Sequence, residues 1–310
     1  MDRKPVEVKS YANIAIIKYW GKADAEKMIP ATSSISLTLE NMSTVTQLSP
    51  LEDAETDAFY IAGVQQSDAE REKMSKVLDL FRQDPTEYVK IDSCNNMPTA
   101  AGLSSSSSGL SALVKAANDY FGCEKTQSEL AQIAKFASGS ASRSFFGPLS
   151  AWDKDTGEIF RVETDLKLAM IMLVLNDRKK PISSRDGMKR AAETSAYFPE
   201  WIKQSEQDYK DMLAYLKAND FERVGELTEA NALRMHETNH QAEPGFSYLT
   251  DESYKAMEVV RALRQSGEQC YFTMDAGPNV KVLCLEHDLE RLARIFEKDY
   301  HVILSTTRTL

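Results

Sequence analysis

The 310-residue sequence has little cysteine and no long hydrophobic run, and each scarcity excludes a class of protein. Its four cysteines are widely spaced and form no C-x-x-C pair, which argues against a zinc ribbon or a redox couple. We expect Cys94, Cys123, Cys270 and Cys284 to be buried free thiols in a reducing compartment. No apolar run reaches the roughly 18 residues that span a bilayer, and the N-terminus has no signal-peptide core. The sequence therefore predicts a cytoplasmic protein without a membrane segment.

The sequence also has fewer positively charged than negatively charged residues. Lys and Arg number 37 against 47 Asp and Glu, which leaves a formal net charge of −10. A general nucleic-acid-binding protein would carry a basic excess, so the charge argues against that class. An anionic small molecule is compatible with the balance if the few cations gather at one site. The chain is about twice the length of a usual single domain, which predicts two packed domains.

The pattern of the first part of the chain predicts a strand-rich domain. Apolar alternation predicts strands at residues 6–17, 44–48, 59–64 and 88–93. Helical spacing predicts helices at residues 69–81, from the serine run 104–108 onward, and after Thr126, which has capping-box spacing with Glu129.

The second part is richer in helices. After a buried strand at residues 168–175, the pattern predicts helices at 184–194, 198–217, 221–236, 250–265 and 289–298, and strands at 269–274, 280–285 and 302–305. Because a strand-rich part is followed by a helix-rich part, we place a domain boundary near residues 176–182 and expect an α+β chain.

Residues 98–109 (PTAAGLSSSSSG) form a run of small residues between a predicted strand and a predicted helix. Small residues let a ligand approach the backbone closely, and the start of a helix presents free N–H groups to an anion. The segment lacks the Walker A pattern, and a flexible Gly/Ser linker is the alternative. Because a well-patterned helix follows at once, the sequence favours phosphate binding.

Three further segments place polar side chains beside turns. Residues 13–22 (NIAIIKYWGK) end an apolar stretch with two lysines and a glycine that permits a tight turn. Residues 138–144 (SGSASRS) surround Arg143, whose planar fork suits a carboxylate or phosphate, with small residues. In residues 272–280, Asp275 lies where a predicted strand ends and a turn begins, and there it could orient or deprotonate a hydroxyl. Alone, the first and last are better explained by solvated lysines and a turn-capping aspartate, and the second equally well by an ordinary loop.

Residues 236–240 (HETNH) match the H-E-x-x-H pattern of zinc proteases on a predicted helix. A zinc site needs a third ligand and a helix that holds both histidines on one face. Pro244 and Gly245 predict that the helix ends near His240, and no third histidine follows at the required spacing. With only an acidic third ligand left open, the pattern does not favour a metalloprotease.

Four segments taken together resemble one family. NIAIIKYWGK, PTAAGLSSSSSGL, SGSASRS and MDAGPNV are similar, in the same order from about residue 8 to about residue 285, to the signature stretches of mevalonate diphosphate decarboxylase in the GHMP kinase superfamily. The Gly/Ser loop alone marks only the superfamily. The resemblance implies an α+β, two-domain GHMP kinase-like fold. Its N-terminal ATP-loop α/β domain would span residues 1–180, and a C-terminal ferredoxin-like domain with extra helices would span 181–310.

The resemblance also implies site residues. The catalytic residues would be Asp275, Arg143 and Lys18. The substrate-binding residues would be Tyr19, Trp20, Gly21, Lys22, Arg71, Ser138, Gly139, Ser140, Ala141, Ser142, Arg143, Ser184 and Arg185. The ATP loop would use Pro98, Ala101, Gly102, Leu103, Ser104, Ser105, Ser106 and Ser107, with Ser105 and Ser106 nearest to the phosphates or to Mg²⁺. The family usually reads Gly-Leu-Ala-Ser-Ser-Ala in this loop, whereas this chain has serine at 104 and 107.

The activity implied by the resemblance is ATP-dependent decarboxylation of (R)-mevalonate 5-diphosphate to isopentenyl diphosphate in the mevalonate pathway. The 3-hydroxyl would be phosphorylated first and the phosphate then eliminated with CO₂. The resemblance further implies ATP and Mg²⁺ as cofactors and a homodimer. A simple kinase of the same superfamily is the alternative, since it would keep the loop and the aspartate turn without needing the Arg143 segment. A ligand-binding regulator is a third reading, disfavoured because Asp275 and both lysines are present.

Overall fold

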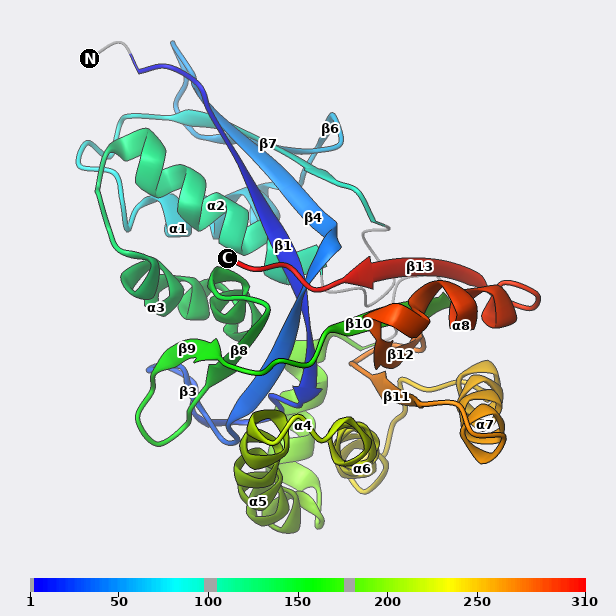
Figure 1. Ribbon diagram of the computed structural model, residues 1–310. Helices are drawn as coiled ribbons and strands as arrows, with labels where there is room; N and C mark the ends of the chain where they lie inside the picture. Colours follow the sequence, from blue (N-terminus) through cyan, green and yellow to red (C-terminus); the bar gives the residue numbers. More distant parts are fainter. Residues whose placement is uncertain (1–2, 98–104, 176–181) are drawn as a thin grey trace.

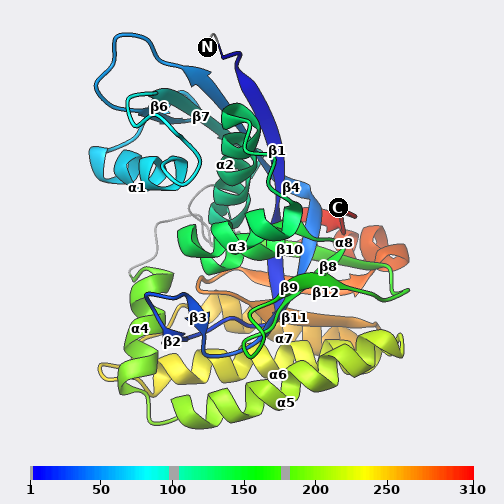
Figure 2. The ribbon, with the colours of Figure 1, turned by 90° about the vertical axis from the view of Figure 1, so that its left-hand side faces the viewer.

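The computed structural model describes residues 3–97, 105–175 and 182–310 and is a mixed α+β structure built on two large β-sheets (Figures 1 and 2). A third, two-stranded sheet is formed by β2 (Lys22–Asp24) and β3 (Ile29–Pro30). The α+β class expected from the sequence is confirmed.

The first large sheet has seven strands arranged around the long strand β4 (Ser34–Pro50). Strand β1 (Val6–Ile17) pairs along one edge of β4, while β7 (Val89–Asn95) and β8 (Leu149–Trp152) share the other edge. β9 (Ile159–Val162) pairs with β8 and completes that end of the sheet. The early strand segments are one 12-residue strand, which continues across two register irregularities.

The segment expected as one strand at 59–64 is a hairpin. β5 (Ala58–Ile61) and β6 (Val64–Gln65) are joined through Ala62 and Gly63, which have φ of 49° and 77°. Positive φ turns the chain back on itself, and glycine adopts it without steric cost. The apolar pattern alone did not reveal this turn.

Three helices lie beside the first sheet (Figure 1). They are α1 (Asp68–Leu78), α2 (Ser105–Phe121) and α3 (Gln127–Ala137). The predicted capping box of α3 is present, because the Thr126 side chain accepts a bond from the Glu129 N–H and the Glu129 carboxylate accepts one from Thr126. A 3₁₀-helix, η1 (Gly139–Phe145), follows α3.

The second sheet has the strand order of a ferredoxin-like domain. Its order is β11 (Cys270–Met274), β12 (Val280–Leu285), β10 (Leu168–Val174) and β13 (His301–Thr306). A 3₁₀-turn η2 (Glu286–Asp288) and α8 (Leu289–Phe296) connect β12 to β13. Four helices lie between β10 and β11 in the chain: α4 (Ser184–Thr194), α5 (Phe198–Lys217), α6 (Phe221–His240) and α7 (Asp251–Gln265). A ferredoxin-like unit has one helix in this connection, so three of the four helices described there are extra, in agreement with the extra helices expected from the sequence.

The strand pairing differs from a division of the chain at 180/181. Strand β10 would then belong to the N-terminal domain, but it pairs with β12 and β13 in the second sheet. The two sheets therefore divide between Val162, where β9 ends, and Leu168, where β10 begins.

Strand β10 is apolar throughout because both faces of its sheet are covered. Leu168, Met170 and Met172 belong to a core that also contains residues of β1 and β4. Ala169, Ile171 and Leu173 alternate with them and pack in a second core with α7 and α8. The first of these cores joins the two sheets, and the candidate site lies beside it.

Candidate active site

Asp275 lies between two buried lysines that come from different sheets. It follows β11, and its Oδ1 atom is 2.7 Å from the Nζ atom of Lys18, which follows β1. Its Oδ2 atom is 3.1 Å from the Nζ atom of Lys281 on β12. The side chains of Lys18 and Lys281 are 2% and 0% exposed, whereas that of Asp275 is 23% exposed. Asp275 is thus the member of this cluster with exposed surface, while its Oδ2 atom is buried.

The charges of this cluster depend on one another. Burial alone would raise the pKa of the Asp275 carboxyl, but the nearby Lys18 and Lys281 ammonium groups outweigh it and hold the pKa well below its usual range. Burial lowers the pKa of Lys18 to about 8, although Asp275 opposes this and Lys281 reinforces it. At neutral pH the site therefore holds an ionised carboxylate and a protonated but easily titrated Lys18.

Helix α6 fixes the backbone of Lys18. The Asn231 side chain accepts a 2.8 Å hydrogen bond from the Lys18 N–H and donates a 2.9 Å bond to Asp208 on α5. Arg234 contacts both oxygens of the same Asp208 carboxylate, at 3.3 and 3.4 Å. Asn231 and Asp208 are buried, so this chain of contacts is shielded from water.

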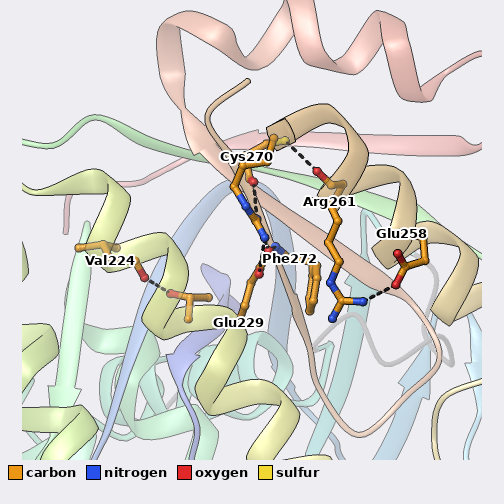
Figure 3. A network of polar contacts seen from close by, with 9 residues as sticks. Val224, Glu229, Glu258, Arg261, Cys270 and Phe272 are labelled. Carbon is orange, nitrogen blue, oxygen red and sulfur yellow. Dashed lines mark hydrogen bonds and ion pairs between the residues drawn. The ribbon is translucent and has the colours of Figure 1, made fainter. Parts of the chain in front are cut away.

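The same helix also holds the strand that leads to Asp275 (Figure 3). The Glu229 carboxylate accepts a 3.0 Å hydrogen bond from the Phe272 N–H. It also pairs with Arg264, at 2.6 and 2.9 Å, and Arg264 donates to the Cys270 carbonyl. Because β11 is an edge strand, its outward N–H groups have no strand to pair with, and Glu229 satisfies one of them.

Arg143 is buried in η1 and is held by two serines of β4. Its Nε atom donates to Ser36 Oγ at 3.0 Å and its Nη1 atom donates to Ser34 Oγ at 2.7 Å. Burial lowers its pKa to about 10, while Tyr19 and Asp275 oppose that shift, so the guanidinium stays protonated at neutral pH. Two of its nitrogens are committed to the sheet, which fixes the plane of the guanidinium.

The small residues around Arg143 shape this 3₁₀-helix. Ser138 Oγ lies 3.1 Å from Ser140 Oγ, and Ser142 donates to the Gly139 carbonyl at 2.7 Å. Ala141 is fully buried in the core beneath α2 and α3. A Cβ atom at Gly139 would lie 2.7 Å from the Tyr19 ring, so only glycine lets η1 approach Tyr19 this closely. The predicted Ser138–Arg143 loop therefore lies against the Tyr19 segment.

Residues Tyr19 to Lys22 make the turn that the sequence predicted. Gly21 has φ of 111°, and an added Cβ would collide with the Phe198 ring. Trp20 is anchored from α5, since Trp201 Nε1 donates to its carbonyl at 2.9 Å. The Tyr19 ring lies 5.2 Å from the Trp152 ring, and burial raises the pKa of Tyr19 to about 12 although the charges of Arg143 and Arg185 oppose it.

Helix α4 packs against the same turn, whereas Arg71 forms ion pairs within its own helix. Trp20 packs in one core cluster with Met188 and Ala191 of α4. Burial and then the Arg185 charge lower the pKa of Lys22. Ser184 begins α4 directly before Arg185. Arg71 lies on α1, where its ion pairs within the described ranges are with Asp68 and Glu72 at 3.4 and 3.8 Å. No contact between Arg71 and Lys18, Asp275 or Arg143 occurs in the described part of the chain.

The serine run divides at the start of α2. Pro98, Ala101, Gly102, Leu103 and Ser104 lie outside the described residues. Ser105 begins α2 and Ser106 is exposed, whereas Ser107 is fully buried and its Oγ atom accepts a 3.5 Å hydrogen bond from the Asn13 N–H of β1. The Ser107 side chain therefore faces the sheet, and its expected role in binding ATP stays a prediction.

The two histidines of HETNH lie in unlike surroundings. α6 ends at His240, as predicted. His236 is buried and His240 is partly exposed beside Glu237, at 3.5 Å. Burial and the nearby Lys18 charge lower the pKa of His236 to about 3. No group of three His, Cys, Asp or Glu side chains suited to a metal occurs within residues 3–97, 105–175 and 182–310.

The cysteines differ in part from the expectation that all four are buried. The four cysteines are free thiols, but Cys94 is exposed and Cys123 is only partly buried, so burial holds only for Cys270 and Cys284. No helix in the described ranges is long and apolar enough to cross a membrane.

Several residues that build this site were not identified from the sequence. They are Lys281, Ser34, Ser36, Asn231, Asp208 and Glu229. Lys281 carried a usable signal, because it is the single charge in an otherwise apolar strand (VKVLCL) directly after the aspartate turn. The others are ordinary polar residues whose partners lie far away in the chain.

Comparisons with known proteins cover both halves of the chain. Residues 10–161 match the family model of the diphosphomevalonate decarboxylase-like N-terminal domain, and residues 170–309 match that of the mevalonate 5-diphosphate decarboxylase C-terminal domain. A curated diphosphomevalonate decarboxylase from Candida albicans is 32% identical over 317 residues, which cover 94% of this chain and 88% of that protein.

Solved structures agree over almost the whole length. A mevalonate pyrophosphate decarboxylase from Streptococcus pyogenes is 63% identical with a TM-score of 0.96, covering 100% of this chain and 98% of that chain. The structure of MDDEF in complex with MVAPP, AMPPCP and magnesium is 39% identical with a TM-score of 0.92, covering 99% of this chain and 97% of that chain.

Proposed function

The chain belongs to the diphosphomevalonate decarboxylase family, and we propose that it uses ATP to convert (R)-mevalonate 5-diphosphate into isopentenyl diphosphate, CO₂, ADP and phosphate. The reaction belongs to the mevalonate pathway of isoprenoid synthesis. The proposal rests on the proximity of Lys18, Asp275 and Arg143 near the core that the two sheets share. Lys18 and Asp275 form a 2.7 Å ion pair and the Arg143 charge acts on Lys18, which supports one shared site.

The three groups have complementary roles. Asp275 accepts a hydrogen bond from the substrate 3-hydroxyl and orients its oxygen toward the γ-phosphorus of ATP. Because two lysines hold its pKa low, it orients the hydroxyl in the ground state and takes up the proton only as the oxygen–phosphorus bond forms. Arg143 holds the C1 carboxylate in the plane that its two serine contacts define.

Elimination then follows from this placement. The bond between C3 and the new phosphate breaks, and positive character develops at C3. The electrons of the bond between the carboxylate and its neighbouring carbon form the new double bond, and CO₂ leaves. Cations near the departing phosphate stabilise its charge, and Lys18 is the group placed to do so.

Binding of two polyphosphates fits the charge of the site. Lys18 and Lys281 both pair with one carboxylate, and the Arg143 charge acts on Lys18, which leaves an excess of positive charge in a molecule whose net charge is −10. We place the substrate diphosphate against Tyr19 to Lys22 and against Ser184 and Arg185, because α4 meets that turn. Arg71 remains a proposed contact that rests on the family resemblance alone.

ATP is proposed to bind at the start of α2, where Ser106 is exposed and where the positive end of a helix favours phosphate. Ser105 and Ser106 are the residues that would hold Mg²⁺, which when bound with ATP neutralises phosphate charge. The relative solved with MVAPP, AMPPCP and magnesium supports this pair of substrates and this metal.

The proposal is tested by mixing the protein with MgATP and mevalonate 5-diphosphate and following phosphorus NMR together with CO₂ release. Free phosphate and CO₂ in equal amounts are expected. ADP with a stable new phosphoester and no CO₂ would identify a kinase instead, and binding without either product would identify a regulator.

We also propose that the chain acts as a cytoplasmic homodimer, which rests on the family resemblance. Sedimentation at several protein concentrations tests the assembly: a dimer is expected, and a species of 34.8 kDa throughout would contradict it.

A further inference from the structure

Lys281 lies outside every motif of the sequence and is nevertheless a full member of the site. It is the single charged residue of β12, and its side chain is fully buried. Along this strand Val282 packs in the core beneath α7 and α8, whereas Leu283 packs in the core between the two sheets. Alternation along a strand therefore directs Lys281 to the same side as Leu283, toward the end of β1.

A buried lysine is costly unless its charge is paired. Lys281 meets Asp275 Oδ2 at 3.1 Å, while Lys18 occupies Oδ1 at 2.7 Å. The terminal torsion of an aspartate is soft, so a single ion pair leaves the carboxylate free to turn about its axis. Two ammonium groups on two different oxygens fix its plane.

We propose that Lys281 is a positioning residue for the decarboxylase reaction, which holds Asp275 Oδ2 so that Oδ1 stays directed at Lys18 and the substrate hydroxyl. The inference rests on the proposed role of Asp275 in the reaction. It assigns the two lysines different tasks. Lys18 faces the reacting phosphate, and Lys281 keeps the carboxylate in place when Lys18 turns toward that phosphate.

The charge of Lys281 also acts on its neighbours. The charged groups that interact with it are Asp275 after β11 and Lys18 after β1, and the neutral His236 on α6 also lies within reach of its charge. Its positive charge adds to burial in lowering the pKa of Lys18, and it helps Lys18 to lower that of Asp275. Removing the charge therefore raises both pKa values, and the alkaline limb of a pH–rate profile, which Lys18 sets, moves to higher pH.

The experiment compares Lys281→Met, which removes both charge and donor, with Lys281→Gln, which keeps a donor without charge. For Lys281→Met we expect kcat to fall by roughly 10²-fold, the scale on which misplaced reacting groups cost rate. The KM values for ATP and mevalonate 5-diphosphate should change by less than about threefold, since the contact acts on the reacting group and not on binding. Lys281→Gln should recover part of kcat while its pH profile stays displaced.

The matched control is Thr273→Val. Thr273 is the register partner of Lys281 on β11, is buried, and its hydroxyl has no hydrogen-bond partner in the described part of the chain. This variant should keep the parent pH profile and kcat. Thermal melting of all variants shows whether each is folded, and Lys281→Gln carries the test if Lys281→Met is not.

A folded Lys281→Met enzyme with parent kcat and an undisplaced pH profile would overturn the inference. So would a further 10²-fold loss when Lys281→Met is added to Asp275→Asn, because a residue acting through Asp275 should have no further effect once Asp275 is changed. Failure of the proposed function looks different, since the parent protein itself would then release no CO₂ from MgATP and mevalonate 5-diphosphate.

Discussion

At the scale of single residues, Asp275 is the group on which the proposed chemistry depends. Asp275→Asn keeps the size of the side chain and an oxygen for Lys18, and the position is partly open to water, so the variant should fold and bind ATP. It removes the carboxylate, and kcat should fall by at least ~10³-fold, the scale of a lost acid–base group.

Steady-state turnover together with ATP binding checks this prediction. Asp155→Asn is the control, because Asp155 is an exposed carboxylate whose ion pair is with its neighbour Lys154. Near-parent turnover of Asp275→Asn would remove Asp275 from the mechanism.

Arg143 gives a second prediction at this scale. Its two serine contacts require two nitrogens in one plane, and a lysine has only one nitrogen to offer. Arg143→Lys should therefore lower kcat/KM for mevalonate 5-diphosphate by about 10²-fold while ATP binding is kept.

Kinetics with each substrate varied in turn measure the effect of Arg143→Lys. Arg161→Lys on β9 is the control, because Arg161 is exposed and paired with Glu163. If Arg143→Lys matched the parent enzyme, Arg143 would not grip the substrate carboxylate.

At the scale of elements, α6 positions both halves of the reactive pair. Asn231 holds the end of β1, and Glu229 holds β11 three residues before Asp275. One rigid helix therefore sets the distance between two strands of different sheets. A helix in this place explains how Lys18 and Asp275 meet across 257 residues of sequence.

Glu229→Ala tests this arrangement. It leaves the Phe272 N–H without an acceptor on a buried edge, so the free energy of unfolding should fall by about 1–3 kcal/mol. Chemical denaturation measures the loss. Glu258→Ala removes an exposed ion pair with Arg261 (Figure 3) and should change the free energy of unfolding by less than about 0.5 kcal/mol. Equal effects of the two substitutions would show that Glu229 does not anchor β11.

Local pattern predicted most elements because the signals are local. The Thr126–Glu129 cap, the apolar face of α7 and the end of α6 before Pro244 all depend on neighbouring residues. The pattern assigned β10 to the first domain because strand pairing is not local: its partners begin more than 100 residues later. Similarly, no spacing connects Arg143 to Ser34 and Ser36, so the resemblance located the site but not the residues that hold it.

At the scale of the whole molecule, the two sheets share a core. Ile14 and Leu37 of the first sheet pack in one cluster with Met170 and Leu283 of the second. Backbone contacts add to this, since the Arg308 N–H donates to the Thr38 carbonyl at 2.8 Å after β13. Separating the domains would expose this apolar surface on both sides.

We therefore expect the chain to unfold in a single transition. Calorimetric and van't Hoff enthalpies should agree, and circular dichroism and tryptophan fluorescence should give the same midpoint, because Trp152 reports on the first domain and Trp201 on α5. Met170→Ala, which opens a cavity in the shared core, should destabilise by about 2–5 kcal/mol and lower the midpoint of both probes together. Met257→Ala, in the core between β11 and α7, is the matched substitution away from the join and should also lower one common midpoint. Two calorimetric transitions, or a Met170→Ala variant in which only one of the two midpoints moves, would mean that the domains fold independently and that the site is assembled only after each is complete.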